Sequence, residues 1–301
     1  MQHEENNTFL IHGHRGCRGL LPENSIPSFI KACDLGVDAL ELDVVVTMDG
    51  QILVSHDPFM HHEICCKPDR SIISEEEEHN FNIYAMSISE AKKFLCGIQP
   101  HPRFPDQKQI ECFKPTLVEL VDEINLHCSR ANRRPPTWTI EIKSSIEGDR
   151  IFHPSPDAYA EIFLSIFKTL NLPSGYIIQS FDDRILNELY NLDRDLNLVL
   201  LFENLMPTLD AALQKLNFSP FGIGPHYLCV DDALVNYCNI NGLQLLVWTV
   251  NDVHEMSRLS ALGVKNIITD FPDMAIAFRE RLVEMKTKKR VDQSTNPYQS
   301  F

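Results

Sequence analysis

Short apolar runs alternate with longer amphipathic stretches along almost the whole chain of 301 residues, and this alternation constrains the fold most strongly. A continuous apolar run is typical of a strand buried on both faces, whereas apolar residues three or four positions apart indicate a helix. Strands are predicted at residues 8–12, 39–46, 137–142, 176–181, 197–202, 221–225, 243–249 and 265–269. Helices are predicted near residues 25–35, 116–131, 157–170, 183–192, 208–217, 231–241, 252–262 and 273–285.

Eight strands, each followed by a helix, predict an α/β fold, the (β/α)8 or TIM barrel. The alternative is an open, doubly wound parallel sheet, whose first strand-to-helix turn would carry the spacing Gly-x-Gly-x-x-Gly. The glycines of the first turn stand instead at positions 13, 16 and 19, among histidine and arginine. The sequence therefore favours the barrel.

One long segment interrupts the alternation. After a hairpin signal at Asp49-Gly50, residues 58–115 are irregular and contain one good helical stretch, near 88–97. A segment of this length inside a compact barrel is usually functional, so we expect a small insertion after the second-strand hairpin that acts as a lid. The predicted boundaries are 8–285 for the barrel domain, with the insertion at 58–115 inside it, and 286–301 for a flexible C-terminal tail.

The charge and the cysteines exclude some classes of partner and compartment. A net charge of −15 argues against nucleic acid as a partner, although a few local cations suffice for a small phosphate. No apolar run reaches the length of about 18 residues that a membrane-spanning helix needs, and the polar start lacks a signal-peptide core. Nine cysteines without a Cys-x-x-Cys pair indicate reduced thiols. We expect a cytoplasmic protein, or a periplasmic one if a signal peptide was removed; the oligomeric state stays open.

Two predicted strands carry charged residues where apolar ones are expected. Glu41 and Asp43 lie two positions apart in the second strand, and Glu141 and Lys143 lie two apart at the end of the third, so each pair points to one side. Buried charges are costly unless they are paired or bind a metal. Three carboxylates at the C-terminal ends of barrel strands are typical of an oxygen-ligand site for a divalent cation. The alternative is ion pairing, for instance of Glu41 with Arg15 and of Glu141 with Lys143.

Two histidines lie near the same end of the predicted barrel. His14 follows the first strand, and His56 ends the hairpin after the second. A lone histidine is more often a packed polar residue than a catalyst, but two histidines beside a predicted metal site are better candidates. Together with the cations Arg15 and Lys143 they suit phosphodiester cleavage, in which cations hold phosphoryl oxygens while imidazoles transfer protons.

The chain resembles the glycerophosphodiester phosphodiesterases in eight short motifs that occur in order between about residue 14 and residue 270. The motifs are His14-Arg15-Gly16, Pro22-Glu23-Asn24, Glu41-x-Asp43, His56-Asp57, Glu141-x-Lys143, Gln179-Ser180-Phe181, Trp248-Thr249 and Thr269-Asp270. The resemblance implies a TIM barrel with a small inserted segment after the second-strand hairpin. It also implies one divalent cation, Ca²⁺ or Mg²⁺, bound by Glu41, Asp43 and Glu141, with His14 and His56 as general acid and base and Arg15 and Lys143 as phosphate contacts.

Four further features have weaker interpretations. Trp248 would form an apolar wall over the glycerol or the leaving alcohol, although core packing explains it equally well. Glu23 is expected to have a supporting role, and Asn24 fits a helix cap at least as well as a ligand contact. Residues 61–66, HHEICC, lack the paired spacing of a zinc site, which argues against a dedicated metal role.

These observations predict a metal-dependent phosphodiesterase that hydrolyses glycerophosphodiesters, as small-molecule substrates, to glycerol 3-phosphate and an alcohol. No serine or cysteine stands beside a histidine in a recognised nucleophile motif. The hypothesis, which the resemblance also implies, is that the glycerol 2-hydroxyl is the nucleophile and that a cyclic phosphate forms first. One alternative is a phospholipase D-like enzyme acting on lysolipids or sphingomyelin. Another is a barrel that only binds phosphoesters, which the presence of both histidines and all three carboxylates disfavours.

Overall fold

The strands lie where the sequence predicts them in the computed structural model of the chain, which describes residues 9–204 and 209–294. The parallel strands in this part of the chain are β1 (Leu10–Gly13), β2 (Ala39–Val46), β6 (Thr137–Ile142), β7 (Tyr176–Ser180), β8 (Leu198–Phe202), β9 (Gly222–Pro225), β10 (Gln244–Val247) and β11 (Asn266–Thr269). Every residue of β2 is buried, as a strand covered on both faces requires.

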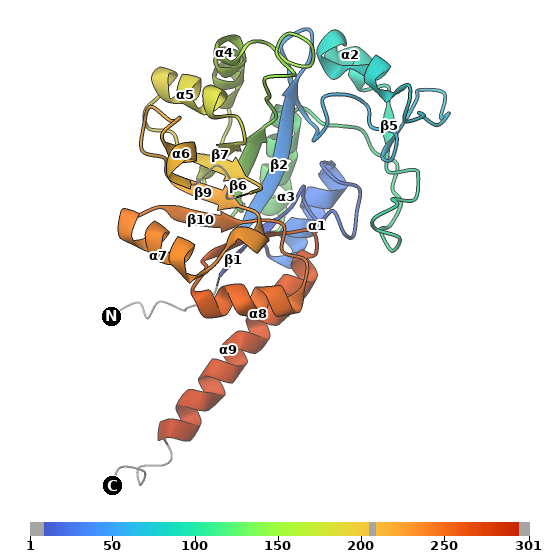
Figure 1. The fold of residues 1–301 in the computed structure, drawn as a ribbon. Helices are drawn as coiled ribbons and strands as arrows, with labels where there is room; N and C mark the ends of the chain where they lie inside the picture. The colour runs from blue at the N-terminus through green and yellow to red at the C-terminus, as the bar shows by residue number, and fades with distance from the viewer. Residues whose placement is uncertain (1–8, 205–208, 295–301) are drawn as a thin grey trace.

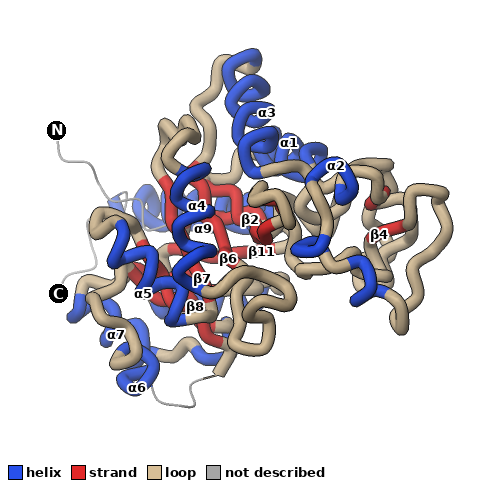
Figure 2. Tube along the Cα trace, turned by 90° about the horizontal axis from the view of Figure 1, so that it is seen from above, coloured by secondary structure: helices blue, strands red, loops and turns tan. Residues whose placement is uncertain are grey.

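These eight described strands close into a barrel (Figures 1 and 2). Hydrogen-bonded neighbours follow the order β1, β11, β10, β9, β8, β7, β6 and β2, and β2 pairs again with β1. A further strand, β3 (Ile52–Val54), runs antiparallel to β2 and forms the hairpin predicted at Asp49-Gly50. The predicted TIM barrel is therefore confirmed, because an open sheet would leave β1 and β2 unpaired with each other.

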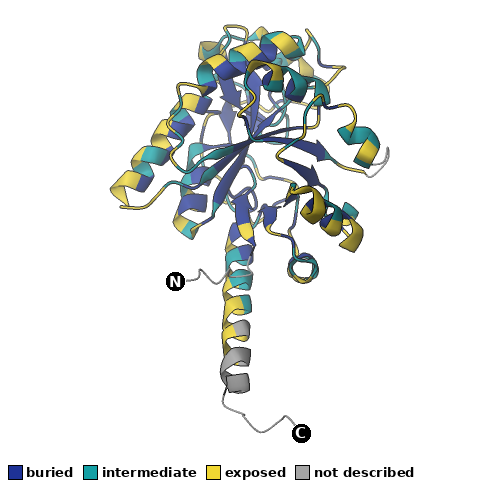
Figure 3. Ribbon diagram, turned by 90° about the vertical axis from the view of Figure 1, so that its left-hand side faces the viewer, coloured by how far each residue is buried: buried dark blue, intermediate teal, exposed yellow. Residues whose placement is uncertain are grey.

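A helix follows each barrel strand and covers the outside of the barrel (Figures 1 and 3). The helices of the described chain around the barrel are α1 (Ile26–Leu35), α3 (Leu117–Arg130), α4 (Pro156–Phe167), α5 (Asp183–Leu192), α6 (Leu209–Leu213), α7 (Asp232–Asn241), α8 (Val253–Leu262) and α9 (Pro272–Ser294), with a short 3₁₀ helix, η3 (Tyr227–Cys229), before α7. The core lies between helices and strands, where Phe29, Trp138 and Phe163 are fully buried.

Two helix ends differ from their predictions. The helix predicted near 208–217 is described only as the short α6, and residue 208 lies outside the described residues. The helix predicted to end at 285 continues as α9 to Ser294 and projects from the barrel (Figure 1), so the predicted end of this helix is corrected. The charged run 286–290 contains good helix formers, and charge alone does not end a helix. Residues 295–301 lie outside the described residues. No helix among those described is long and apolar enough to cross a bilayer.

The insertion, residues 58–115, packs as a lobe beside the barrel (Figures 1 and 2). Its elements are β4 (Cys65–Cys66), η1 (Glu78–Phe81), η2 (Ile83–Ala85), α2 (Ile88–Ala91) and β5 (Leu95–Cys96). The helix predicted near 88–97 is thus a single turn. Met60, Ile73 and Ile83 form a separate apolar cluster with Leu53 of the hairpin, which gives this irregular segment a core of its own.

Candidate active site

Three carboxylates meet at the C-terminal ends of two neighbouring barrel strands. Glu41 and Asp43 belong to β2 and Glu141 belongs to β6, where Asp43 and Glu141 are paired in register. One oxygen of each lies within 4.8 Å of the other two, and all three residues are buried. Leu42, between the two acids of β2, packs in the core with the helices, so the alternation predicted from sequence is observed.

Burial and neighbouring charges shift the pKa values of these three acids in different directions. Burial, together with the charges of Asp43 and Glu141, raises the pKa of Glu41 well above its ordinary value of 4.5. Burial also raises the pKa of Glu141, although Lys143 opposes this shift. Burial acts on Asp43 in the same direction, but the guanidinium of Arg15 holds its pKa well below the usual range. Two of the three acids therefore bind a proton more readily than they would in water, and a cation between them would oppose this shift.

The oxygens around the cluster fit a hard divalent cation. Among the described residues, the buried atoms Asp43 Oδ1 and Gln179 Oε1 have no hydrogen-bond partner. Gln179, on β7, donates from Nε2 to Glu41 Oε1 at 3.2 Å. Leaving buried oxygens unpartnered is costly, and carboxylate and amide oxygens are ligands that Ca²⁺ and Mg²⁺ prefer. Glu41, Asp43 and Glu141 are therefore the residues that would hold the ion.

The turn after β1 brings two arginines against the cluster. The Arg15 guanidinium contacts Glu23 Oε1 at 2.8 Å and Asp43 Oδ2 at 3.0 Å, and Arg18 Nε lies 2.6 Å from Glu23 Oε2. These arginines overcome the effect of burial and lower the pKa of Glu23 to about 2. The turn needs Gly16, which has a φ of 89°, because a Cβ there would lie 2.5 Å from a hydroxyl oxygen of α1. Glu23 thus supports the site by holding both arginines.

Asn24 is not the N-cap of α1, which was one of the two roles predicted for it. Ser25 is the N-cap of α1 and accepts the N–H of Ser28. Asn24 has a φ of 53° and donates from Nδ2 to Asp43 Oδ2 at 2.9 Å. The cap prediction is wrong because asparagine tolerates positive φ as readily as it caps a helix, and sequence alone does not separate these two uses.

Ion pairing, the alternative to a metal site, is also present. Lys143 Nζ lies 2.6 Å from Glu141 Oε1 and 3.7 Å from Asp43 Oδ1. Glu41 accepts the backbone N–H of Arg15 at 3.0 Å, whereas the Arg15 guanidinium pairs elsewhere. The buried carboxylates of Glu23, Glu41, Asp43 and Glu141 face the cations Arg15, Arg18 and Lys143. These ion pairs leave the buried atom Asp43 Oδ1 without a hydrogen-bond partner, so pairing and metal binding are compatible.

Each of the two predicted histidines is held at Nδ1 by a carboxylate. His14 Nδ1 lies 2.6 Å from Asp270 Oδ1, and its Nε2 lies 3.8 Å from Glu41 Oε2. His56 Nδ1 lies 3.0 Å from Asp57 Oδ1. Burial lowers the pKa of both imidazoles. A carboxylate at Nδ1 favours the tautomer with its proton there, so Nε2 of each ring is the atom that can exchange a proton with a ligand.

Asp270→Asn tests how His14 is positioned. We expect kcat to fall about 10- to 100-fold, less than the 10²–10⁴-fold that general acid–base catalysis contributes, because the imidazole itself is kept. Because the Asp270 carboxylate raises the pKa of His14, the pH profile of kcat/KM should also move to lower pH. Asp252→Asn, at the N-cap of α8, is the matched control. An unchanged kcat and pH profile, at unchanged cation affinity by calorimetry, would show that Asp270 does not act on His14.

A pocket of about 350 Å³ lies over the carboxylates. Its lining includes seven of the eight predicted site residues, His14, Arg15, Glu41, His56, Glu141, Lys143 and Trp248, while the eighth, Asp43, is fully buried. Trp248 Nε1 donates to the carbonyl of Gly224 at 2.8 Å, and its ring meets the edge of Phe181 at a centroid distance of 5.4 Å. The pocket therefore combines a charged floor with an aromatic wall, as expected for a small polar ligand with an organic substituent.

Several residues of the site were given no role by the sequence, among them Asp270, Asn251 and Arg103. Asp270 directly follows β11, and His14 directly follows β1, which is the hydrogen-bonded neighbour of β11. The position of Asp270 just after a strand could therefore have marked it as a site residue. Asn251 donates to Asp270 Oδ2 at 2.6 Å. Arg103, from the insertion, also lines the pocket, and no pattern in residues 58–115 marks it.

Comparisons with known proteins agree on one family. Residues 14–274 match the family model described as the Glycerophosphoryl diester phosphodiesterase family. The chain is 30% identical over 267 residues to a glycerophosphodiester phosphodiesterase of Caldanaerobacter subterraneus subsp. tengcongensis, covering 89% of this chain and 96% of the relative. It is 23% identical to a lysophospholipase D of Rattus norvegicus, covering 86% and 82%. A crystal structure from Silicibacter pomeroyi superposes with a TM-score of 0.80 at 25% identity, covering 92% and 95%.

Proposed function

The chain belongs to the glycerophosphoryl diester phosphodiesterase family, and we propose that it hydrolyses glycerophosphodiesters to glycerol 3-phosphate and an alcohol with one divalent cation, Ca²⁺ or Mg²⁺. The observation that carries this proposal is the meeting of two carboxylate-held imidazoles with a buried cluster of three acids in one pocket. Proton transfer and binding of an anionic phosphoryl group are the two tasks that phosphodiester cleavage requires.

The residues of the pocket divide these tasks. Arg15, whose Nε and Nη1 already contact acids, would present Nη2 to a phosphoryl oxygen, and Lys143 would contact the phosphate from the other strand. Glu41, Asp43 and Glu141 would hold the cation. When bound, the cation supplies positive charge that stabilises the phosphoryl oxygens. Trp248 would pack against the glycerol or the leaving alcohol.

His14 and His56 would act as general acid and base. One neutral imidazole removes the proton of the glycerol 2-hydroxyl, whose oxygen attacks the adjacent phosphorus. The other protonates the oxygen of the leaving alcohol, and an anionic phosphodiester in the pocket favours this charged form. The product of this step is a five-membered cyclic phosphate, which water opens to glycerol 3-phosphate as the histidines exchange roles.

A substrate panel tests the proposed function. Glycerophosphocholine, glycerophosphoethanolamine, glycerophosphoinositol and lysophosphatidylcholine would each be assayed with Ca²⁺, with Mg²⁺ and with excess chelator. We expect release of glycerol 3-phosphate from the glycerophosphodiesters, loss of turnover with chelator and recovery when metal is restored. Full turnover after chelation, with metal content checked by elemental analysis, would contradict the cation requirement.

Hydrolysis of lysolipids is the second candidate. Two observations favour it: the rat lysophospholipase D among the relatives, and the wall of Trp248, Phe181 and Leu201 beside the charged floor of the pocket. The same panel separates the two candidates, because a kcat/KM for lysophosphatidylcholine above that of every glycerophosphodiester would reverse the assignment.

Replacing either histidine with alanine should lower kcat by at least about 10²-fold, the lower end of general acid–base contributions. His254→Ala is the matched control, since this histidine is exposed on α8. Cation affinity, measured by calorimetry, should stay within a few-fold of wild type in both variants. A variant that folds and retains more than a tenth of wild-type kcat would remove that histidine from the proton-transfer scheme.

We also propose that the insertion, residues 58–115, acts as a rim or lid that selects the leaving alcohol. Arg103, an exposed residue, brings a positive charge from the insertion to the pocket. Arg103→Ala should weaken kcat/KM for glycerophosphoinositol about 2- to 5-fold relative to glycerophosphocholine, as expected for an exposed charge worth up to about 1 kcal/mol. Arg70→Ala, on the same insertion but paired with Glu111, is the control. An unchanged ranking of substrates in the Arg103 variant would contradict the selective role of this residue.

A further inference from the structure

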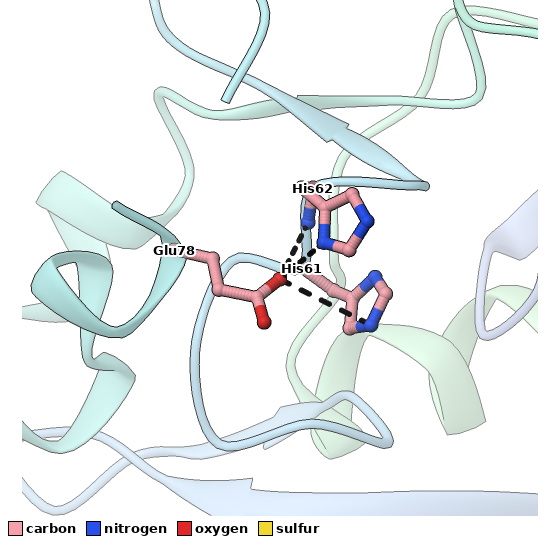
Figure 4. Close-up of side chains that lie close together, drawn as sticks. All are labelled: His61, His62 and Glu78. Atoms are coloured by element: carbon pink, nitrogen blue, oxygen red, sulfur yellow. Dashed lines mark hydrogen bonds and ion pairs between the residues drawn. The ribbon is translucent and has the colours of Figure 1, made fainter. Parts of the chain in front are cut away.

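Two histidines and a glutamate converge within the insertion, outside the lining of the active-site pocket (Figure 4). His61 and His62 precede β4, and their rings stack with centroids 4.6 Å apart. Glu78 begins η1 and reaches back to them: its Oε2 lies 2.6 Å from His62 Nδ1 and 4.0 Å from His61 Nε2. The same oxygen accepts the backbone N–H of His62 at 3.0 Å. His62 and Glu78 are sixteen residues apart in the sequence. Together with His61, their side chains nevertheless meet at one point.

The three side chains are placed as metal ligands are. One ligand atom of each lies within 4.8 Å of the other two, Glu78 is buried, and both histidines are partly exposed. Glu63 and Glu75 add negative charge around His62, which favours a cation. None of the three residues lines the catalytic pocket, so no part of the proposed hydrolysis explains their convergence.

We propose that His61, His62 and Glu78 form a second metal site that binds a borderline divalent ion such as Zn²⁺, with solvent completing its coordination. The donor set decides the class of ion, since imidazole nitrogens suit Zn²⁺ and similar metals, whereas the all-carboxylate cluster of the active site suits Ca²⁺ and Mg²⁺. Two imidazoles, one carboxylate and an open position form a recognised zinc arrangement. A bound ion ties the segment before β4 to η1 across the lobe.

Small movements convert the observed arrangement into such a site. Zinc-to-ligand distances near 2.0 Å place tetrahedral ligand atoms about 3.3 Å apart. The ion would replace the proton between His62 and Glu78, so their 2.6 Å contact would lengthen, and the 4.0 Å approach of His61 Nε2 would shorten. His61 Nδ1 now accepts the N–H of Glu63 at 3.2 Å. Ligation through Nε2 puts the ring proton on Nδ1, so this bond is released to solvent.

Cobalt spectroscopy of the full chain tests the proposal. Co²⁺ would be titrated into wild-type protein in excess Mg²⁺, and into Glu41→Gln, in which the active-site cluster is altered. We expect one bound Co²⁺ per chain with visible d–d absorption, displaced by Zn²⁺ and retained in Glu41→Gln. Failure of the hydrolysis proposal leaves this result unchanged, because the readout does not involve turnover.

Glu78→Gln and His62→Ala should each lower Co²⁺ affinity by at least about tenfold, while His254→Ala, an exposed histidine on α8, should keep it. Zn²⁺ should raise the melting temperature of wild type and not of Glu78→Gln. If His62→Ala fails to fold, Glu78→Gln, which keeps an oxygen acceptor, decides the outcome. Unchanged absorption in Glu78→Gln, or an intense near-ultraviolet thiolate-to-cobalt band, would overturn the proposal, the latter by assigning the ion to cysteines.

Discussion

Glu41→Gln is expected to lower kcat/KM by at least about 10³-fold, because the side chain keeps its shape while the cation loses an anionic ligand. A metal contributes several kcal/mol of charge stabilisation to a phosphoryl transition state, and about 4 kcal/mol corresponds to about 10³-fold in rate. Asp122→Asn, on the exposed face of α3, is the matched control for loss of one carboxylate. Ca²⁺ and Mg²⁺ affinities from calorimetry should fall in parallel with the rate. Wild-type rate and affinity in Glu41→Gln would exclude Glu41 as a ligand.

The same variant makes a prediction about stability without metal. Because the pKa of Glu41 is raised in the folded protein, this carboxyl contributes stability that is fully present below its ordinary pKa of 4.5 and is lost as pH rises through the raised value. Glutamine stays neutral, so the melting temperature of Glu41→Gln in chelator should exceed that of wild type increasingly as pH rises above 4.5. Saturating cation should reverse this order, since only wild type binds it tightly. An equal pH dependence in both proteins would show that Glu41 is already ionised without a metal.

A substrate that lacks the glycerol 2-hydroxyl, a phosphodiester of propane-1,3-diol, is expected to be cleaved at least about 10³-fold more slowly than its glycerol counterpart. The 2-hydroxyl stands next to the phosphorus, and well-oriented intramolecular nucleophiles reach effective molarities of about 10⁵–10⁸ M. Without the 2-hydroxyl, the nucleophile would have to be a water molecule that is not part of the substrate. The expected loss exceeds any that a weakened binding contact of one hydroxyl would cause.

Phosphorus NMR measures both rates and detects the intermediate. With the natural substrate, a five-membered cyclic phosphate should accumulate transiently. The matched control is a substrate lacking the 1-hydroxyl, a phosphodiester of propane-1,2-diol, which keeps the 2-hydroxyl beside the phosphorus and should react by the cyclic route. Cleavage of the propanediol diester at a rate comparable to the glycerol diester would mean that water attacks directly, and the cyclic phosphate would have to be abandoned.

Local patterns were sufficient for the barrel, and they singled out residues that the structure brings together at one pocket. Strands such as β2 and β6 match their predicted bounds because burial on both faces demands an unbroken apolar run, which is visible in the sequence. The same rule singled out Glu41, Asp43 and Glu141, because a charged side chain inside a buried strand is costly unless it is paired or binds a metal. His14 and His56 stood out by following strand ends, where barrel sites lie. The end of α9 was misjudged, because a charged sequence fits both a fraying tail and a solvated helix.

Only the tertiary structure decided which distant residues meet. Asp270 holds His14 because β11 and β1 are neighbours in the closed barrel, although they are the last and first strands of the sequence. Glu78 reaches His61 and His62 because the lobe packs as one unit, and this contact changes the interpretation of a histidine pair whose spacing argued against a metal. The period of the apolar residues indicates which side of a helix or strand is buried. It was therefore enough to predict the helices and strands and to identify the charged residues buried in them. It carries no information about loop paths or contacts between distant segments, which depend on closure and packing of the whole chain.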